Sequence, residues 1–321
     1  MRYSRIILLL SFCFAYTIQA QNSPTDYVNP FVGTDYNGHT FPGATTPFGM
    51  VQLSPDTRID GSWEGCSGYH YSDDRIYGFS HTHLSGTGVS DYGDVLIMPQ
   101  LGKGSFNPEE YSATFKHENE WASPGYYSVK LDKGIVAEMT TTTRVGFHKY
   151  TFTQNEFSVV IDLEHRDYLK DGALTIIDNQ TLSVKRVSSA WAKQQHCYAR
   201  ILFSSPFKYR YNSTKTKIIL EFNVENKELL IKSGISFVDE DGAKKNLEAE
   251  LAHWDFQLCR VEAMSAWNEA LGKIEVKNGD LEKLKTFYTA LYHVMIHPNV
   301  AMDVDGNYRG LDQKIYIAEG F

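Results

Sequence analysis

Chemically capable side chains are concentrated in one glycine-rich stretch, residues 61–94 (GSWEGCSGYHYSDDRIYGFSHTHLSGTGVSDYGD). It holds seven glycines, three histidines, one tryptophan and several carboxylates, without a sustained helical or strand period. Such a segment is typical of a loop held by a scaffold, where binding residues usually lie. Aromatic rings stack on pyranose faces, and carboxylates and imidazoles hydrogen-bond hydroxyl groups. This mixture therefore suits a sugar.

Within this stretch, Trp63 stands between Ser62 and Glu64, which is an unusual place for a core residue. Trp63 is interpreted as a platform for a sugar ring, with packing inside the loop as the alternative. Glu64 beside it is a candidate for hydrogen bonds to sugar hydroxyls.

His81 and His83 form an H-x-H pair, which on a strand would point both rings to one side. That arrangement permits a metal site, but a third ligand at a defined spacing is missing. We expect hydrogen-bonded scaffolding from the pair, and His83 is kept as a candidate substrate contact.

Several other chemistries lose their usual signatures. The chain contains no HExxH, GxSxG or CxxC motif, which argues against a zinc peptidase or a serine esterase. Residues 303–307 (DVDGN) begin like a calcium loop, but position six is Tyr308 and position twelve is Lys314, so a turn is expected.

The remaining polar residues of the loops have a plainer interpretation. Four carboxylates are predicted to shape the loops rather than bind a ligand: Asp73, Asp74, Asp91 and Asp94. Cys66 is predicted to be a small buried group rather than a nucleophile. After removal of Cys13 with the signal segment, the odd set of Cys66, Cys197 and Cys259 allows at most one disulfide.

Residues 1–20 (MRYSRIILLLSFCFAYTIQA) predict a signal peptide cleaved after Ala20, so we expect an exported protein, periplasmic or secreted. Removing Arg2 and Arg5 lowers the formal net charge from −8 to −10, which argues against a nucleic-acid partner. No later apolar run approaches the roughly 20 residues of a membrane span.

The elements that must position these residues are mostly strands. From Gly125 to about Asp239, short runs with alternation and β-branched residues follow each other without helices, which predicts an antiparallel β-sandwich. Near residue 245 the period changes. Leu247, Leu251, Trp254, Leu258 and Val261 predict one amphipathic helix to about Leu271, with Trp254 in the core.

A second helix is predicted from about Asp280 to Ile296, with Tyr288 in the core. The expected organisation is a signal peptide at 1–20, a β-sandwich at 21–244, a helical linker at 245–272 and the start of a helical domain at 273–321. One helix and a loop cannot bury their own apolar face, so the helical domain is expected to be cut short at Phe321.

Several sequence motifs resemble the N-terminal part of glycoside hydrolase family 92, the calcium-dependent exo-α-mannosidases. These motifs are residues 27–34 (YVNPFVGT), 42–50 (PGATTPFGM), 65–71 (GCSGYHY), 76–88 (IYGFSHTHLSGTG), 287–293 (FYTALYH), 298–299 (PN) and 308–312 (YRGLD). They run in order along the chain. The resemblance implies a β-sandwich, a helical linker and the first helix of a truncated (α/α)6 barrel.

The resemblance also implies inverting hydrolysis of non-reducing terminal α-mannosides in mannose-containing glycans. The catalytic acid and base and most calcium ligands are then expected beyond Phe321, so none is assigned here. Trp63 matches a loop tryptophan that packs on the sugar, and Asp312 matches an aspartate that binds its hydroxyls. Asp312 has an alternative role as the cap of a helix beginning near Gln313. The alternative function is a sandwich that binds carbohydrate without turnover, or an inactive fragment.

Overall fold

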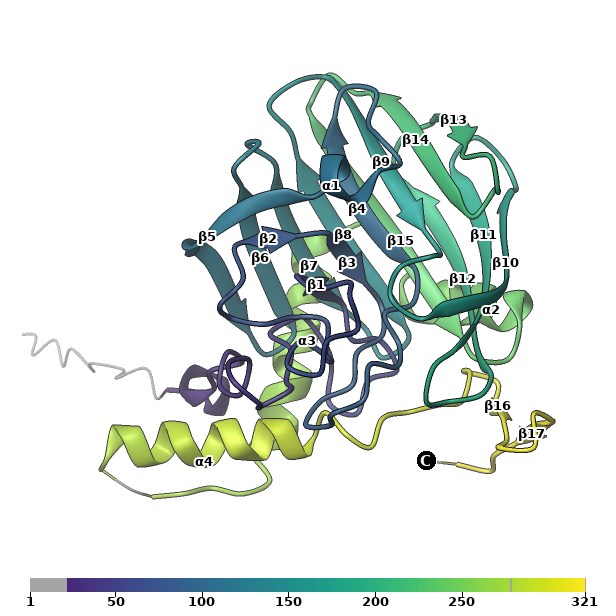
Figure 1. Ribbon diagram of the computed structural model, residues 1–321. Coiled ribbons are helices and arrows are strands. Elements are labelled where there is room, and N and C mark those ends of the chain that lie inside the picture. The colour runs from purple at the N-terminus through teal and green to yellow at the C-terminus, as the bar shows by residue number, and fades with distance from the viewer. Residues whose placement is uncertain (1–21, 278, 321) are drawn as a thin grey trace, which may run out of the picture.

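The computed structural model describes residues 22–277 and 279–320, so the predicted signal peptide lies outside the described residues. Two antiparallel sheets pack face to face, followed by helices and a small hairpin (Figure 1). The six-stranded sheet has the order β1 (Ser54–Asp56), β3 (Gly78–Ser80), β4 (Leu96–Leu101), β9 (Glu156–Asp162), β14 (Lys217–Asn223) and β13 (Lys208–Tyr211). The predicted sandwich is confirmed.

The nine-stranded sheet forms the second layer. Its order is β10 (Tyr168–Ile176), β11 (Thr181–Ser189), β12 (Gln195–Phe203), β15 (Glu228–Ser236), β8 (Val145–Thr151), β7 (Val136–Thr141), β6 (Tyr126–Leu131), β5 (Ala113–Ser123) and β2 (Arg75–Ile76). Two short helical turns, η1 (Pro24–Tyr27) and α1 (Pro108–Tyr111), complete this part of the chain.

Period-two alternation fills the space between the sheets. In β12 the side chains of Cys197, Ala199, Ile201 and Phe203 are buried, while those between them are partly exposed. Inward side chains of β9 such as Val159 join the same core. Burying a large aliphatic or phenylalanine side chain contributes about 1.5–3 kcal/mol each, so this alternation specifies which face of each strand turns inward.

The prediction of one helix from 245 to Leu271 is wrong, because the chain forms α2 (Glu240–Glu250) and α3 (Phe256–Leu271) with a break between them. At the break, the ammonium group of Lys232 donates a hydrogen bond to the carbonyl oxygen of Leu251 at 2.9 Å. The carboxylate of Asp255 then caps α3 by accepting from the backbone N–H of Leu258. Both side chains form hydrogen bonds with backbone atoms that would bond to each other within a continuous helix.

The break also resets the buried face of the second helix. Leu258 and Val261 are 43% and 53% exposed, and Trp254 is 37% exposed rather than in the core. The face of α3 that packs inward instead carries Cys259, Ala263, Trp267 and Ala270.

The second predicted helix is confirmed as α4 (Leu281–Val294), capped by the carboxylate of Asp280. Its buried face includes Leu284, Tyr288 and Tyr292, so the core position predicted for Tyr288 is confirmed. The ring of Tyr27 stacks on Tyr288 with centroids 5.6 Å apart, which ties the start of the described chain to α4. Figure 1 shows α4 lying across one end of the sandwich, next to the loops of residues 30–95.

A chain of hydrogen bonds between two fully buried histidines crosses the sandwich core. His81 Nδ1 lies 2.8 Å from the carbonyl oxygen of Val95, so Nδ1 carries a proton and Nε2 accepts. His148 Nε2 lies 3.1 Å from His81 Nε2 and therefore donates, while His148 Nδ1 accepts from the hydroxyl of Tyr150 at 2.9 Å. Every polar atom of this chain is paired while both imidazoles are neutral.

We expect this pair to make the protein acid-sensitive. Burial lowers the pKa of His81 to about 4 and holds the pKa of His148 well below its ordinary value. Unfolded histidines take up protons below about pH 6.5, so the stability contributed by the pair is present at neutral pH and is lost as pH falls from about 6.5 toward 4. Urea unfolding midpoints at pH 7 and pH 5 should differ less in His148→Phe than in wild type. His253→Phe is the control, and equal pH dependence in all three proteins would contradict the prediction.

Candidate functional site

The glycine-rich loops are held by a fully buried carboxylate at the end of β1. Asp56 lies 3.1 Å from Nε2 of both His83 and His165, and 3.5 Å from the guanidinium of Arg166. The hydroxyl of Ser80 also donates to it. Burial by itself would raise the pKa of Asp56, but the facing imidazoles of His165 and His83 hold this pKa well below its ordinary value. Asp56 is thus a fixed negative charge beneath the loops.

A second buried pair fixes the far end of the same loop. The guanidinium of Arg186 on β11 donates to the carboxylate of Asp94, and both side chains are fully buried. Arg186 also donates to the carbonyl oxygens of Leu163 at 3.0 Å and His165 at 2.9 Å. Asp94 accepts in addition from the hydroxyl of Thr82 at 2.8 Å. The pair therefore joins the loop to β11 and to the segment between β9 and β10.

Two other loop carboxylates, Asp91 and Asp73, also hold the chain in place. Asp91 accepts from the backbone N–H groups of Trp191 and Ala192, each at 2.9 Å, which fastens the loop to the turn between β11 and β12. Asp73 accepts from the guanidinium of Arg58 at 2.9 Å. These contacts agree with the predicted loop-shaping role.

The two histidines of the H-x-H pair have separate partners. His83 is fully buried, with Nδ1 2.8 Å from the carbonyl oxygen of Gln52 and Nε2 against Asp56. His81 lies in the core against His148 instead. Both histidines therefore act as hydrogen-bonded parts of the scaffold. A direct contact of His83 with a sugar stays a prediction, and both of its ring nitrogens already face other groups.

Trp63 lies at the rim of the loop cluster, with 57% of its surface exposed. Its indole meets the imidazole of His39 nearly edge to face, with ring centroids 4.5 Å apart and an interplanar angle of 73°. Glu64 beside it points to solvent and pairs with Arg58 at 3.3 Å. Both side chains are therefore accessible, and their contact with substrate stays a prediction.

Gly88 sets the position of the indole. A Cβ atom at Gly88 would lie 2.4 Å from Nε1 of Trp63, which is far inside van der Waals contact. We expect Gly88→Ala to displace Trp63 and to change its fluorescence emission maximum, with a loss of stability of no more than about 1 kcal/mol because the loop is at the surface. Val89→Ala, in the same loop, is the control. An unchanged emission spectrum of Gly88→Ala would contradict this placement of the ring.

Beneath Trp63 lies a cysteine–histidine contact that sequence reasoning missed. The thiol of Cys66 donates to the carbonyl oxygen of Thr87 at 2.9 Å, and its sulfur lies 3.2 Å from Nδ1 of His39. Burial raises the pKa of the Cys66 thiol, which keeps it protonated and a poor nucleophile. Cys66, Cys197 and Cys259 are all free and buried. The prediction of a small buried group at Cys66 is confirmed.

Asp312 occupies the tip of the hairpin formed by β16 (Asn307–Arg309) and β17 (Ile315–Ile317). Its carboxylate accepts from the hydroxyl of Tyr316 at 2.8 Å and from the backbone N–H of Lys314 at 3.1 Å. The alternative role as a helix cap is wrong, because the following residues form a strand. Its contact with substrate stays a prediction.

The hairpin reaches the loop cluster through the turn after β11. The side-chain amide of Gln313 donates to the carbonyl oxygen of Gln194 at 3.5 Å, and this turn is the one held by Asp91. The predicted turn at 303–307 anchors the other end of the hairpin. There, Asp303 is buried, and its carboxylate accepts from Ser236 and Asn246 at 2.7 Å each.

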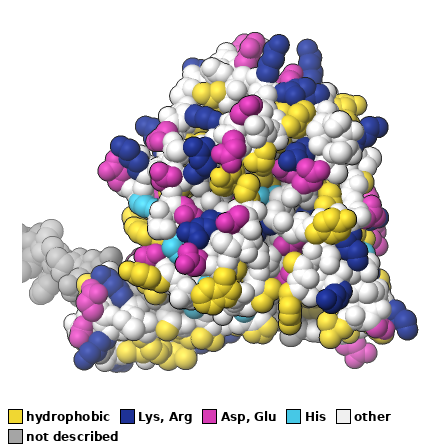
Figure 2. Space-filling model, viewed as in Figure 1, with side chains coloured by type: hydrophobic (Ala, Val, Ile, Leu, Met, Phe, Trp, Pro, Cys, Tyr) yellow, Lys and Arg dark blue, Asp and Glu magenta, His cyan; other side chains and the backbone are white. Residues whose placement is uncertain are grey.

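Among residues 22–277 and 279–320, no three His, Cys, Asp or Glu side chains are grouped so as to hold a metal ion. No calcium ligand is assigned among the described residues. In the same part of the chain, no helix is both long and apolar enough to cross a membrane. Figure 2 shows positive and negative side chains interspersed over one face of the molecule.

Arg166, Arg186 and His165 were missed as well, although one signal in the sequence was available. Leu182, Val184 and Arg186 alternate along one strand, so the arginine shares the inward face of two apolar residues. An arginine in such a position must be paired when it is buried.

A two-sheet sandwich that carries aromatic and carboxylate loops at one end and runs on into helices is an arrangement of glycoside hydrolases. The chain belongs to glycosyl hydrolase family 92. Residues 27–236 match the model of the family's N-terminal domain, and residues 242–321 match the model of its catalytic domain.

Solved structures and a curated relative agree with this membership. A family GH92 alpha-mannosidase from Bacteroides thetaiotaomicron is 34% identical, with a TM-score of 0.83 over 94% of this chain and 45% of that chain. A family GH92 inverting mannosidase from the same organism is 28% identical, with a TM-score of 0.81 over 92% of this chain and 43% of that chain. A secreted glycosidase of Arthroderma benhamiae, itself uncharacterized, is 30% identical over 93% of this chain and 44% of the relative. The chain spans less than half the length of each of these relatives.

Proposed function

We propose that the protein supplies the substrate-loop part of an exo-α-mannosidase, which hydrolyses non-reducing terminal α-mannosides. The observation that carries the proposal is the exposed indole of Trp63, held at the rim of the loop cluster above His39. A solved relative with 34% identity is an alpha-mannosidase in complex with mannoimidazole, which supports mannose as the sugar.

Each loop residue has a proposed part in this function. The face of Trp63 packs on the pyranose ring, while Glu64 and Asp312 accept hydrogen bonds from its hydroxyl groups. His83 stays a proposed substrate contact, and its Nε2 lies against Asp56 in the buried charge cluster that keeps the loops in place. Rigid support of this kind reduces the ordering cost of binding.

The proposed hydrolysis inverts the configuration at the anomeric carbon. It needs one carboxyl group to protonate the leaving oxygen and another to activate water, about 6.5–9.5 Å apart. We place this pair in the stretch of the longer relatives that the chain does not cover. We place the calcium of the family there too, in a catalytic domain of which 273–321 is the beginning, after a sandwich at 21–244 and a linker at 245–272. Export to the periplasm or medium is proposed from the leader-like residues 1–20.

The test is binding of methyl α-D-mannopyranoside, measured by calorimetry on the whole chain. Trp63→Ala should weaken binding about 2- to 13-fold, because a ring-stacking contact is worth about 0.5–1.5 kcal/mol. Trp121→Ala is the matched control, since that indole is 62% exposed on β5. Equal losses in the two variants would contradict a platform at Trp63.

Hydrolysis is measured beside binding to separate an enzyme part from a binding module. We expect this chain alone to bind the mannoside without releasing mannose. Release of mannose would refute the placement of the acid and base outside the chain. Binding by this chain would favour the non-catalytic carbohydrate-binding alternative if a longer form of the protein, with its catalytic domain, also released no mannose. No binding at all would contradict the proposed function.

A further inference from the structure

His39, next to the exposed indole of Trp63, has two features that lower stability. Its backbone has a φ of +54°, a left-handed conformation that is uncommon outside glycine. Its side chain is 8% exposed, and within residues 22–277 and 279–320 its Nε2 atom has no hydrogen-bond partner. Both features cost free energy of folding, and such costs are retained mainly at functional sites. The contacts of the imidazole therefore indicate what His39 does.

The backbone of His39 is held by two loops. Its carbonyl oxygen accepts a hydrogen bond from the backbone N–H of Gly86 at 2.7 Å. The next backbone N–H, that of Thr40, donates to the carbonyl oxygen of Gly33 at 3.2 Å. The imidazole therefore starts from a point that is fixed on both sides, and the left-handed backbone determines the direction in which it leaves the chain.

The ring of His39 is oriented by the thiol of Cys66 and in turn meets Trp63. The single proton of the thiol goes to the carbonyl oxygen of Thr87 at 2.9 Å, so the 3.2 Å contact of Sγ with Nδ1 of His39 needs a proton on Nδ1. The imidazole meets the indole at 73°, with ring centroids 4.5 Å apart. A nearly perpendicular contact covers at most one face of the indole, so the other face of Trp63 stays free.

We propose that His39 is a positioning residue for Trp63: its imidazole fixes the plane of the indole, so that the free face is presented to the sugar. The inference rests on the proposed function and names a residue that supports it. Edge-to-face contacts between aromatic rings contribute beyond the area that they bury. A platform that is already held in its bound orientation also loses less freedom when the sugar binds. His39 itself does not touch the sugar, because its unpaired nitrogen is buried.

The first experiment needs no sugar and uses the whole chain labelled with 5-fluorotryptophan. Each of the five tryptophans gives one fluorine NMR resonance, and Trp63→Phe identifies that of Trp63. His39→Asn tolerates the left-handed backbone but removes the ring, so it should shift and broaden the Trp63 resonance. His39→Phe keeps a ring beside the indole and should give a single sharp resonance again. His70→Asn, which removes another buried loop histidine, is the control and should leave the resonance in place.

A second variant tests the orientation of the imidazole without a change at residue 39. Cys66→Ala removes the partner of Nδ1 and should broaden the Trp63 resonance. An unchanged Trp63 resonance in both His39→Asn and Cys66→Ala would overturn the inference. A shift of equal size in His70→Asn would overturn it too, because the effect would then belong to the loops in general.

Binding of methyl α-D-mannopyranoside, measured by calorimetry, tests the effect on the sugar. His39→Asn should weaken binding about 2- to 5-fold, and no more than Trp63→Ala does, because it acts only through that ring. In the Trp63→Ala background the same change should have no further effect, since two changes that act through one contact are not additive. Additive losses, or an unchanged affinity of His39→Asn, would overturn the inference.

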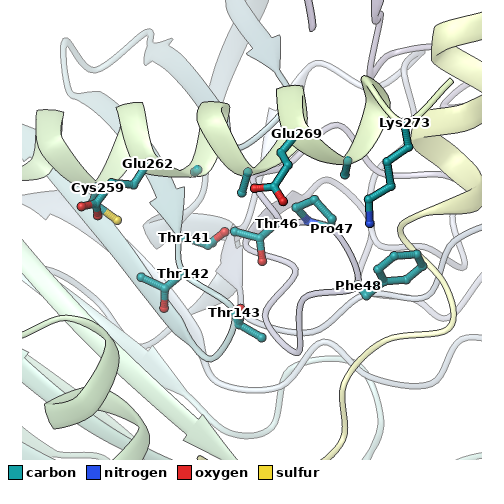
Figure 3. Close-up of a pocket in the computed structure, with 13 residues that line it drawn as sticks. Thr46, Pro47, Phe48, Thr141, Thr142, Thr143, Cys259, Glu262, Glu269 and Lys273 are labelled. Atoms are coloured by element: carbon teal, nitrogen blue, oxygen red, sulfur yellow. The ribbon is translucent and has the colours of Figure 1, made fainter. Parts of the chain in front are cut away.

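The Trp63 resonance also separates failure of this inference from failure of the proposed function. A hollow of about 380 Å³ lies elsewhere, between α3 and the loops at 46–48 and 141–143 (Figure 3). Neither Trp63 nor His39 lines it, so a mannoside bound there would leave the Trp63 resonance in place. Binding without a shift of that resonance, or no binding at all, would refute the proposed function. A resonance that responds to the sugar equally in wild type and His39→Asn would overturn only the role of His39.

Discussion

Replacing Arg186 with methionine should lower the free energy of unfolding by about 3–5 kcal/mol, because it leaves the carboxylate of Asp94 buried without its cation. The change also removes hydrogen bonds to the carbonyl oxygens of Leu163 and His165. Methionine is of comparable length and apolar, so the loss reports the missing charge rather than a large cavity. Urea unfolding followed by circular dichroism measures it.

Lys185→Met is the matched control for that variant. Lys185 is the neighbour of Arg186 on β11 and faces solvent, where its ammonium group pairs with the exposed carboxylate of Asp171. Exposed pairs contribute about 0–1 kcal/mol. A loss for Arg186→Met no larger than that for Lys185→Met would show that the buried pair does not hold the loop. The double variant Arg186→Met with Asp94→Leu should recover part of the loss, since no buried charge remains.

Replacing Trp267 with alanine should cost about 3–5 kcal/mol, the range for truncating a large buried aromatic side chain. Trp267 is fully buried in a second core with Tyr292, whose ring centroid is 4.5 Å away. Its indole N–H also donates to the carbonyl oxygen of Thr45 at 2.6 Å. The residue thus joins α3, α4 and the loop after Phe41, and we expect all three to loosen together.

Two further variants test that account. Trp267→Phe keeps most of the ring but loses the N–H, and should cost about 1–3 kcal/mol, the penalty of an unpaired buried acceptor together with a small cavity. Trp191→Ala removes an indole that is 78% exposed and should change stability by less than about 1 kcal/mol. Hydrogen exchange should show faster opening of α4 in Trp267→Ala, and unchanged exchange there would rule out the joining role.

The predicted strands succeeded where a single periodicity controlled the burial. The strands predicted between Gly125 and about Asp239 are observed there as β6 to β15, because alternation along a strand is a local property. The prediction of one helix after residue 245 was wrong because a side chain distant in sequence interrupts it. Lys232 on β15 donates a hydrogen bond to the carbonyl oxygen of Leu251, where the apolar helical pattern is interrupted. No local sequence pattern indicates that contact.

The candidate site likewise has residues that the sequence predicts and contacts that it does not. Trp63 and Glu64 were identifiable from composition, because an aromatic residue in a glycine-rich loop has little core to join. Their support was not. Asp56 meets His165 and Arg166 across about 110 positions of sequence, and only the packing of the two sheets brings these groups together.

The sequence by itself determined the alternating strands, the order of sandwich and helices, and the loop in which sugar-binding residues are concentrated. These follow from short-range periodicity and residue chemistry. The tertiary structure decided which charges are buried together and where the helix after the sandwich breaks. Such features depend on contacts between distant residues, and the free energy of a buried charge or hydroxyl depends on the partner that folding places beside it.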